Sequence, residues 1–134
     1  MQEVYERPKV EMQRDMDLIR DLLVNIAEDS RFDGTRWFSP NKADDFGVTN
    51  HSVEEVAYHL TLLIEAEYLD GKAGMGVPAI SRLTWDGHEF LDNIRDTSVW
   101  EKTKERLQGI PGVALSVVAA IAEAEIKKRL GLTP

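Results

Sequence analysis

The sequence predicts a mainly α-helical fold with one small β-hairpin, an α+β fold in which a winged-helix-like domain precedes C-terminal helices. Three observations predict it. A helix that opens with a capping box, Ser52 followed by Glu55, runs directly into a short apolar strand pattern. Three glycines within residues 71–76 then indicate a hairpin turn. An amphipathic helix over residues 12–29 precedes this unit, so the order is that of a helix, a second helix and a wing.

The central helix begins at about residue 53 and has one apolar stripe. The stripe repeats at three- and four-residue steps, as a helix with one buried face requires, and comprises Val53, Val56, Ala57, Leu60, Leu63 and Ile64. Between residues 51 and 70 the chain has five carboxylates and no lysine or arginine, which gives a local charge of −5. We therefore expect the exposed side of this helix to be acidic.

The periodicity divides the chain into three parts. Residues 1–11 lack periodicity and contain Pro8, so they are predicted to be an N-terminal extension. Residues 12–96 are predicted to form the winged-helix-like domain, which ends with a helix capped by Thr84. Residues 97–134 are predicted to be a C-terminal helical segment that packs on the same domain or on a partner.

The C-terminal segment contains two predicted helices. A second capping box, Ser98 with Glu101, opens a short helix that ends near Leu107. The last helix covers residues 113–130, and over residues 115–124 it is apolar on nearly every side. Such a helix has to be covered on more than one side.

Residues 30–50 are rich in turn-forming residues, and we expect no regular second helix there, although a full winged helix has one. Residues 36–38 are the only candidate for a short strand in this interval. The three tryptophans, Trp37, Trp85 and Trp100, are predicted to be core or hinge anchors rather than a platform on which bases stack.

The chain has 134 residues, which suits one domain with a single core, and it has no cysteine. The lack of cysteine excludes disulfides and thiolate chemistry and favours a reducing cytosol. The longest apolar stretch, residues 113–122, is too short to span a bilayer, and the N-terminal sequence lacks the apolar run of a signal peptide. We therefore expect a soluble, cytoplasmic protein. Its net charge of −8 weighs against affinity based on phosphate contacts.

Candidates for catalysis or metal binding are weak. His59 and His88, with Glu55 and Glu89 nearby, have none of the spacings that bring metal ligands together. We expect the two histidines to cap or hydrogen-bond across the junction of the central and third helices. Thr84 is better explained as a helix cap than as a nucleophile, and no oxyanion loop is evident. We therefore predict no enzyme activity, no cofactor and no metal.

Several runs of residues carry a family resemblance, namely residues 16–20, 55–60, 63–66 and 83–92, with Trp100 and Lys104 after them. Together they resemble a family of bacterial and phage proteins called domain of unknown function 2513, over about residues 12–107. The resemblance implies no activity, because that family has none assigned. Residues 59–63 and 83–87 also resemble pieces of winged-helix transcription regulators. Glu67 stands where those regulators often have a glycine.

Two functions remain, and neither is catalytic. The favoured function is that of an uncharacterised, winged-helix-like protein-binding module. We expect its last helix to pack on a partner protein or on a second copy of the chain. Because two copies meeting about a twofold axis are the commonest way to cover an apolar helix, we predict a homodimer with Val117, Val118 and Ile121 among its contacts.

The alternative is a DNA-binding transcriptional regulator of bacterial or phage type. In that interpretation Tyr58, Thr61 and Leu62 face a groove of the duplex. The cations that would touch phosphates are Lys72, Arg82 and either Arg14 or Arg36. The carboxylates of the central helix would oppose the phosphates, so nucleic acid is the less favoured partner.

Overall fold

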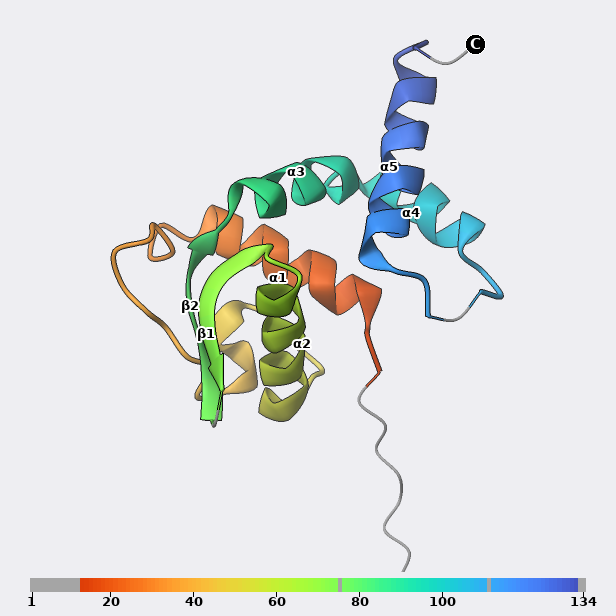
Figure 1. Ribbon diagram of the computed structural model, residues 1–134. Helices are drawn as coiled ribbons and strands as arrows, with labels where there is room; N and C mark the ends of the chain where they lie inside the picture. The colour runs from red at the N-terminus through yellow and green to blue at the C-terminus, as the bar shows by residue number, and fades with distance from the viewer. Residues whose placement is uncertain (1–12, 75, 111, 133–134) are drawn as a thin grey trace, which may run out of the picture.

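The computed structural model describes residues 13–74, 76–110 and 112–132. The elements in chain order are α1 (Met16–Glu28), η1 (Ala43–Phe46), α2 (Val53–Glu65), β1 (Leu69–Gly74), β2 (Gly76–Leu83), α3 (Trp85–Ile94), α4 (Thr97–Arg106) and α5 (Leu115–Arg129) (Figure 1). The predicted fold class is confirmed, because the described residues form five α-helices and one two-stranded antiparallel sheet. The predicted extension, residues 1–11, lies outside the described residues.

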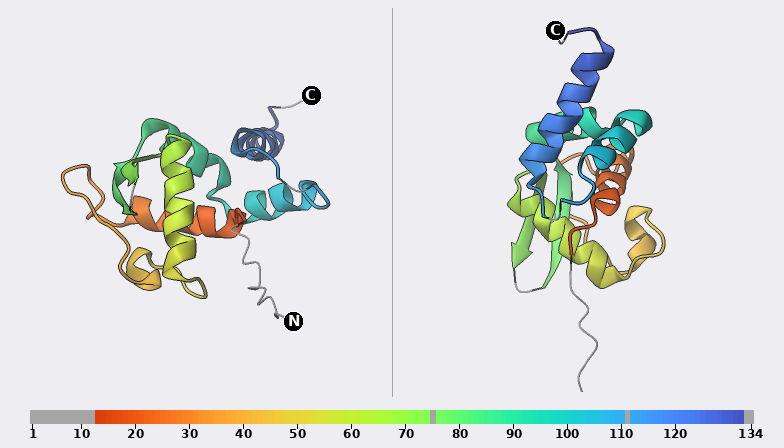
Figure 2. Two further views of the ribbon diagram at one scale, coloured as in Figure 1. Left: turned by 60° about the horizontal axis from the view of Figure 1, so that its bottom comes forward. Right: turned by 90° about the vertical axis from the view of Figure 1, so that its right-hand side faces the viewer.

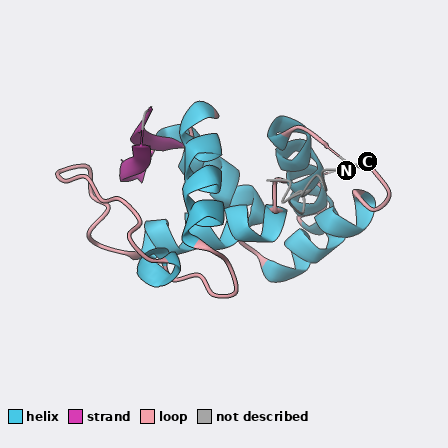
Figure 3. Cartoon of the chain, turned by 90° about the horizontal axis from the view of Figure 1, so that it is seen from below, coloured by secondary structure: helices cyan, strands magenta, loops and turns pink. Residues whose placement is uncertain are grey.

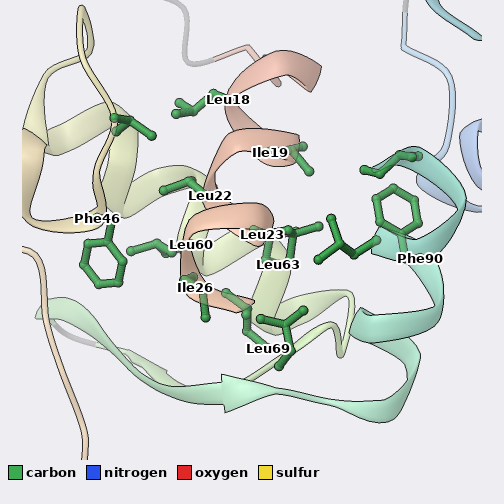
Figure 4. Packing of buried hydrophobic residues seen from close by; sticks show 14 of the residues in the cluster. Leu18, Ile19, Leu22, Leu23, Ile26, Phe46, Leu60, Leu63, Leu69 and Phe90 are labelled. Carbon is green, nitrogen blue, oxygen red and sulfur yellow. The ribbon is translucent and has the colours of Figure 1, made fainter. Parts of the chain in front are cut away.

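Helix α1 contributes a large share of the core. Its buried side chains recur at three- and four-residue steps and are Leu18, Ile19, Leu22, Leu23 and Ile26. Figure 4 shows them packed with Leu60 and Leu63 of α2, Leu69 of β1 and Phe90 of α3. The helix begins at Met16 rather than at residue 12, because Asp15 caps it by accepting a hydrogen bond from the Leu18 N–H at 3.1 Å.

Helix α2 begins as predicted and ends in an unusual conformation. The capping box is confirmed, since Ser52 Oγ accepts from the Glu55 N–H at 3.1 Å and Glu55 Oε1 accepts from the Ser52 N–H at 3.3 Å. At the other end, Glu67 has a φ of 64°. Its N–H donates to the Ile64 carbonyl, and the Tyr68 N–H donates to the Leu63 carbonyl. These are the hydrogen bonds of a Schellman motif, in which a glycine usually occupies the position of Glu67.

The interval between α1 and α2 contains reduced forms of two winged-helix elements. Phe38 forms an antiparallel bridge with Ile80 of β2, with N–H to O distances of 2.9 and 2.8 Å. No regular second helix was predicted in this interval, and the structure has only a single turn of 3-10 helix there, η1. The order of elements is therefore that of a winged helix whose first strand is one bridge and whose second helix is one turn.

The hairpin and α3 are joined by tight backbone contacts. The predicted cap of α3 is confirmed, since Thr84 Oγ1 accepts from the Gly87 N–H at 3.0 Å. The same hydroxyl donates to the Glu67 carbonyl at 2.6 Å, which ties the start of α3 to the end of α2. A Cβ on Gly87 would lie 2.1 Å from the Tyr68 carbonyl oxygen, so only glycine fits this position. The Leu-Thr-x-x-Gly run thus has a structural role.

Helices α4 and α5 follow α3 at the side of the molecule away from the hairpin (Figure 3). The predicted cap of α4 is wrong. Asp96, not Ser98, is the N-cap, and its Oδ1 accepts from the Val99 N–H at 2.9 Å, so the helix begins at Thr97. Both residue types cap well, and the earlier one is the one with the extended backbone that a cap requires. Helix α5 packs on α3 and α4, and its C-terminal end projects beyond them (Figures 1 and 2).

Candidate interaction surfaces

The inner side of α5 belongs to the core of the chain itself. Its buried residues are Val118, Ala122 and Glu125, which lie on one stripe. Val118 is 1% exposed, so its predicted place in a contact with a second copy does not fit the structure. The sequence pattern misplaced Val118 because a helix that is apolar on nearly every side gives no polar residues from which to read its orientation.

The uncovered side of α5 is partly apolar, beside an exposed ion pair between Glu123 and Lys127. We define the outer face of α5 as Val117, Ala120, Ile121 and Ala124. Val117 is 46% exposed, and Ile121 is half-buried, so these two predicted contact residues remain available to a partner. Beyond the helix end, Leu130 and Leu132 are 66% and 67% exposed. The described part of the chain therefore covers only one side of this helix.

Ion pairs fix how α5 lies on its neighbours. Arg106 of α4 lies 3.3 Å from the carboxylate of Glu125, which is only 7% exposed. Arg129 lies 3.3 Å from Asp96, the cap of α4. A buried carboxylate needs such a partner, so the side of α5 that carries Glu125 is committed to the chain's own fold.

The residues proposed for a DNA groove lie on the solvent side of α2 but are only half exposed. Tyr58, Thr61 and Leu62 are half-buried, and the Thr61 hydroxyl donates back to the Ala57 carbonyl at 3.0 Å. Glu54 and Glu65 on the same helix are exposed, and no lysine or arginine lies within α2. A duplex approaching this helix would meet carboxylates, as the sequence predicts.

The proposed phosphate-binding cations already contact other groups of the chain. Lys72 Nζ lies 4.8 Å from the ring centroid of Trp37, and Arg82 Nε lies 3.4 Å from the Asp70 carboxylate. Arg14 donates to the Val113 carbonyl at 2.7 Å, on the side of the chain where α5 begins. Arg14 therefore does not join the hairpin cations on one surface.

The two histidines have different roles from those predicted. His59 is buried and joins α2 to α1, not to α3, because its Nε2 accepts from the Asp15 N–H at 2.8 Å while Nδ1 lies 2.7 Å from the Glu55 carbonyl. These partners define a neutral imidazole with the proton on Nδ1. His88 is exposed. Among the described residues, no group of three or more His, Asp or Glu side chains is placed to hold a metal ion.

A family described as "Hypothetical protein (DUF2513)" matches residues 13–114. The chain belongs to this family. A relative from Haemophilus influenzae, described as an uncharacterized protein, is 32% identical over 124 residues, which is 89% of this chain and 99% of the relative. No solved structure matches the chain.

The DUF2513 match confirms the resemblance predicted over about residues 12–107 and extends it at the C-terminal end. It ends one residue before α5 begins at Leu115, so the family region comprises the winged-helix part, α3 and α4. No described helix is long and apolar enough to cross a membrane.

The tryptophans of the DUF2513 region do not all serve as anchors. Trp100 is buried and donates its indole N–H to Asp17 Oδ1 at 2.8 Å, as an anchor should. For Trp37 and Trp85 the prediction is wrong, because they are 47% and 77% exposed. Trp37 precedes the Phe38 bridge and has Lys72 of β1 over its ring, and Trp85 is the first residue of α3.

Asp17 is a structural residue that sequence reasoning did not single out. Besides Trp100, it accepts from Lys104 Nζ at 3.0 Å, so one carboxylate of α1 holds two side chains of α4. Burial is the largest contribution to the pKa of Asp17 and raises it, but the hydrogen bonds from Trp100 and Lys104 lower this pKa to below its usual range. The pairing spans 83 and 87 residues of sequence, so no local pattern indicates it.

Proposed function

We propose that the chain is a non-enzymatic, winged-helix-like binding module that acts through protein–protein contacts and forms a homodimer through the outer face of α5. The observation that carries the proposal is the exposed apolar side of this helix, on which Val117 is 46% exposed. Apolar residues at that position favour association because burial removes their surface from water.

The position of α5 in the fold supports self-association. Ala120 and Ala124 on the outer face are small and allow two helices to approach closely. The end of α5 projects from the rest of the chain, at a distance from the hairpin (Figure 1). A twofold pairing of this face uses the same residues in both copies and leaves α2 and the hairpin uncovered.

Sedimentation equilibrium tests the proposal. At about 100 μM the unmodified protein should sediment with twice the chain mass, as a dimer with a micromolar dissociation constant does at this concentration. Val117→Glu should halve that mass and leave the monomer folded, since Val117 lies outside the core. Gln108→Glu, which adds the same charge at an exposed position of the turn after α4, is the matched control and should remain dimeric.

A monomer of unmodified protein at this concentration would contradict the dimer. So would equal effects of Val117→Glu and Gln108→Glu, because dissociation would then come from added charge and not from the outer face of α5.

A DNA-binding regulator is the second candidate, and the winged-helix order of the elements favours it. The carboxylates of α2 and the net charge of −8 argue against it. Titration of a labelled random duplex at about 100 mM salt should show no binding tighter than the nonspecific range of about 10⁻⁴ to 10⁻⁶ M. Submicromolar binding that falls steeply with salt would reverse the order of the two candidates.

The proposal includes neither a catalytic group nor a cofactor, and it places the protein in the cytoplasm. Thr84, the one hydroxyl considered as a nucleophile, is committed to the cap of α3 and to the Glu67 carbonyl. The lack of cysteine supports a reducing compartment.

A further inference from the structure

The first turn of α3, at its end farther from α5 (Figure 1), borders a groove. The C-terminal part of α1, the loop after it, the end of β2 and the first turn of α3 enclose this groove of about 350 Å³. Its apolar lining comes from Ile26, Ala27, Phe32 and Leu83. We call it the Trp85 groove, after the residue that forms its outer wall. It shares no residue with the outer face of α5.

Trp85 is both exposed and held in place. It is 77% exposed, although tryptophan is usually well covered in a folded chain. Its indole N–H donates to Glu89 Oε1 at 2.9 Å, one helical turn further along α3. This hydrogen bond fixes the ring, so a partner that stacks on it does not have to order it first. Such preorganised aromatic side chains beside a groove are typical of binding hot spots.

The rim of the Trp85 groove is acidic. Asp33 lines the groove, and Asp86 and Glu89 flank Trp85 on α3; all three are exposed. Arg82 also lines the groove, but its charge is offset by Asp70, 3.4 Å away. The remaining lining residue that can carry a positive charge is His88. The whole chain has a net charge of −8, which attracts cations to this surface and repels anions.

We infer that the Trp85 groove binds a basic segment of a partner protein, with an arginine side chain on the ring of Trp85 and an adjacent apolar side chain on the floor of the groove. A guanidinium plane stacks on an aromatic ring and pairs with a carboxylate at the same time, and the Glu89 carboxylate stands beside the ring. Ala27 and Phe32, which are both half-buried, offer the apolar contact. Self-association through α5 is a separate property, so either can fail without the other.

A charge-matched pair of peptides tests the inference on the full chain. The probes are fluorescein-labelled Gly-Arg-Leu-Arg-Leu-Arg-Gly and Gly-Glu-Leu-Glu-Leu-Glu-Gly, both capped at their ends and followed by fluorescence anisotropy at about 50 mM salt. The basic peptide should bind more tightly than about 1 mM, and the acidic peptide should not. A twelve-residue oligo(dT) strand serves as a third probe for nucleic acid.

Variants separate the groove from general attraction to an acidic protein. Trp85→Leu should weaken binding of the basic peptide about tenfold, as expected for loss of a stacked cation. Glu89→Gln, which keeps an acceptor for the indole N–H but removes the charge, should weaken it about threefold. Trp37→Leu is the control, because Trp37 is exposed but lies outside the groove, and it should leave the affinity unchanged.

Three results would overturn the inference. The first is no binding of the basic peptide below about 1 mM. The second is equal affinity of the unmodified protein and Trp85→Leu, with both shown to be folded by circular dichroism. The third is tighter Trp85-dependent binding of the acidic peptide or of oligo(dT), which would assign the groove to an anionic partner.

Discussion

Helices α2 and α5 are both rich in apolar residues, but the fold covers them to different extents. Helix α2, of 13 residues, buries Val56, His59, Leu60 and Leu63 and places its carboxylates in solvent. Helix α5, of 15 residues, buries a stripe of three residues and leaves Val117 and Ala120 exposed beside the Glu123–Lys127 ion pair. A helix with one apolar stripe is satisfied by its own domain, whereas a helix with two apolar sides retains surface for a partner.

The two helices also end in the same way with different residues. Each ends in a Schellman motif, at Glu67 after α2 and at Gly131 after α5, with φ angles of 64° and 70°. Glycine adopts this left-handed conformation without a steric cost, and glutamate does not. The better covered helix therefore has the more strained end.

The largest predicted effect concerns the stripe of α2. Leu60 is fully buried in the middle of this stripe, so Leu60→Ala should lower the free energy of unfolding by about 2–5 kcal/mol in urea denaturation. Glu54→Ala, on the exposed side of the same helix, should cost only about 0.3–1 kcal/mol through the helix dipole. If both substitutions had equally small effects on the free energy of unfolding, Leu60 would not face the core.

Adjacent valines of α5 give the sharpest comparison of its two sides. Val118→Ala should cost about 2 kcal/mol, because two buried methyl-sized groups are lost and a cavity remains. Val117→Ala should change the free energy of unfolding by less than about 0.5 kcal/mol at about 1 μM protein, where association is weak. If Val117→Ala costs as much as Val118→Ala, both sides of α5 are covered within one chain and the proposed dimer face does not exist.

The carboxylate of Asp17 joins α1 to α4, and its removal should cost about 1 kcal/mol. Because its pKa is lower in the folded chain, its contribution is complete above the usual aspartate pKa and is lost as the pH falls through the folded value, below about pH 4. Asp17→Asn keeps an acceptor for Trp100 but loses the charge near Lys104, so it should remove this pH dependence. Urea midpoints measured between pH 3 and 7 would show whether the acid-induced loss differs between the two proteins; an identical loss rules out Asp17 as its source.

The smallest predicted effect is a stabilisation at the end of α2. Glu67→Gly should raise the free energy of unfolding by about 0.5–1 kcal/mol, because glycine relieves the left-handed backbone that Glu67 adopts. Glu65→Gly, inside the last turn of the same helix, is the opposite control and should cost about 1 kcal/mol. A destabilising Glu67→Gly would mean that the Glu67 side chain makes a contact worth more than the strain.

Much of the fold could be predicted because its signals are local. The capping box of α2, the Thr84 cap and the hairpin depend on residues within a few positions of each other, and the structure confirms all three. Of the three residues predicted for a dimer contact, Val117 and Ile121 are accessible in the fold and Val118 is not. The exposed Trp85 was missed, because a tryptophan in sequence favours burial and nothing local indicates that its ring has no cover.

The sequence by itself determined the order of the helices, the caps of α2 and α3, the hairpin, the family and the acidic side of α2. Each of these depends on spacing along the chain, where polar and apolar residues alternate with a clear period. The tertiary structure alone decided which side of α5 is buried, that Asp17 joins α1 to Trp100 and Lys104, and that His59 faces Asp15. These contacts link residues 44 to 87 positions apart, so they are set by how whole elements pack, which no local period encodes.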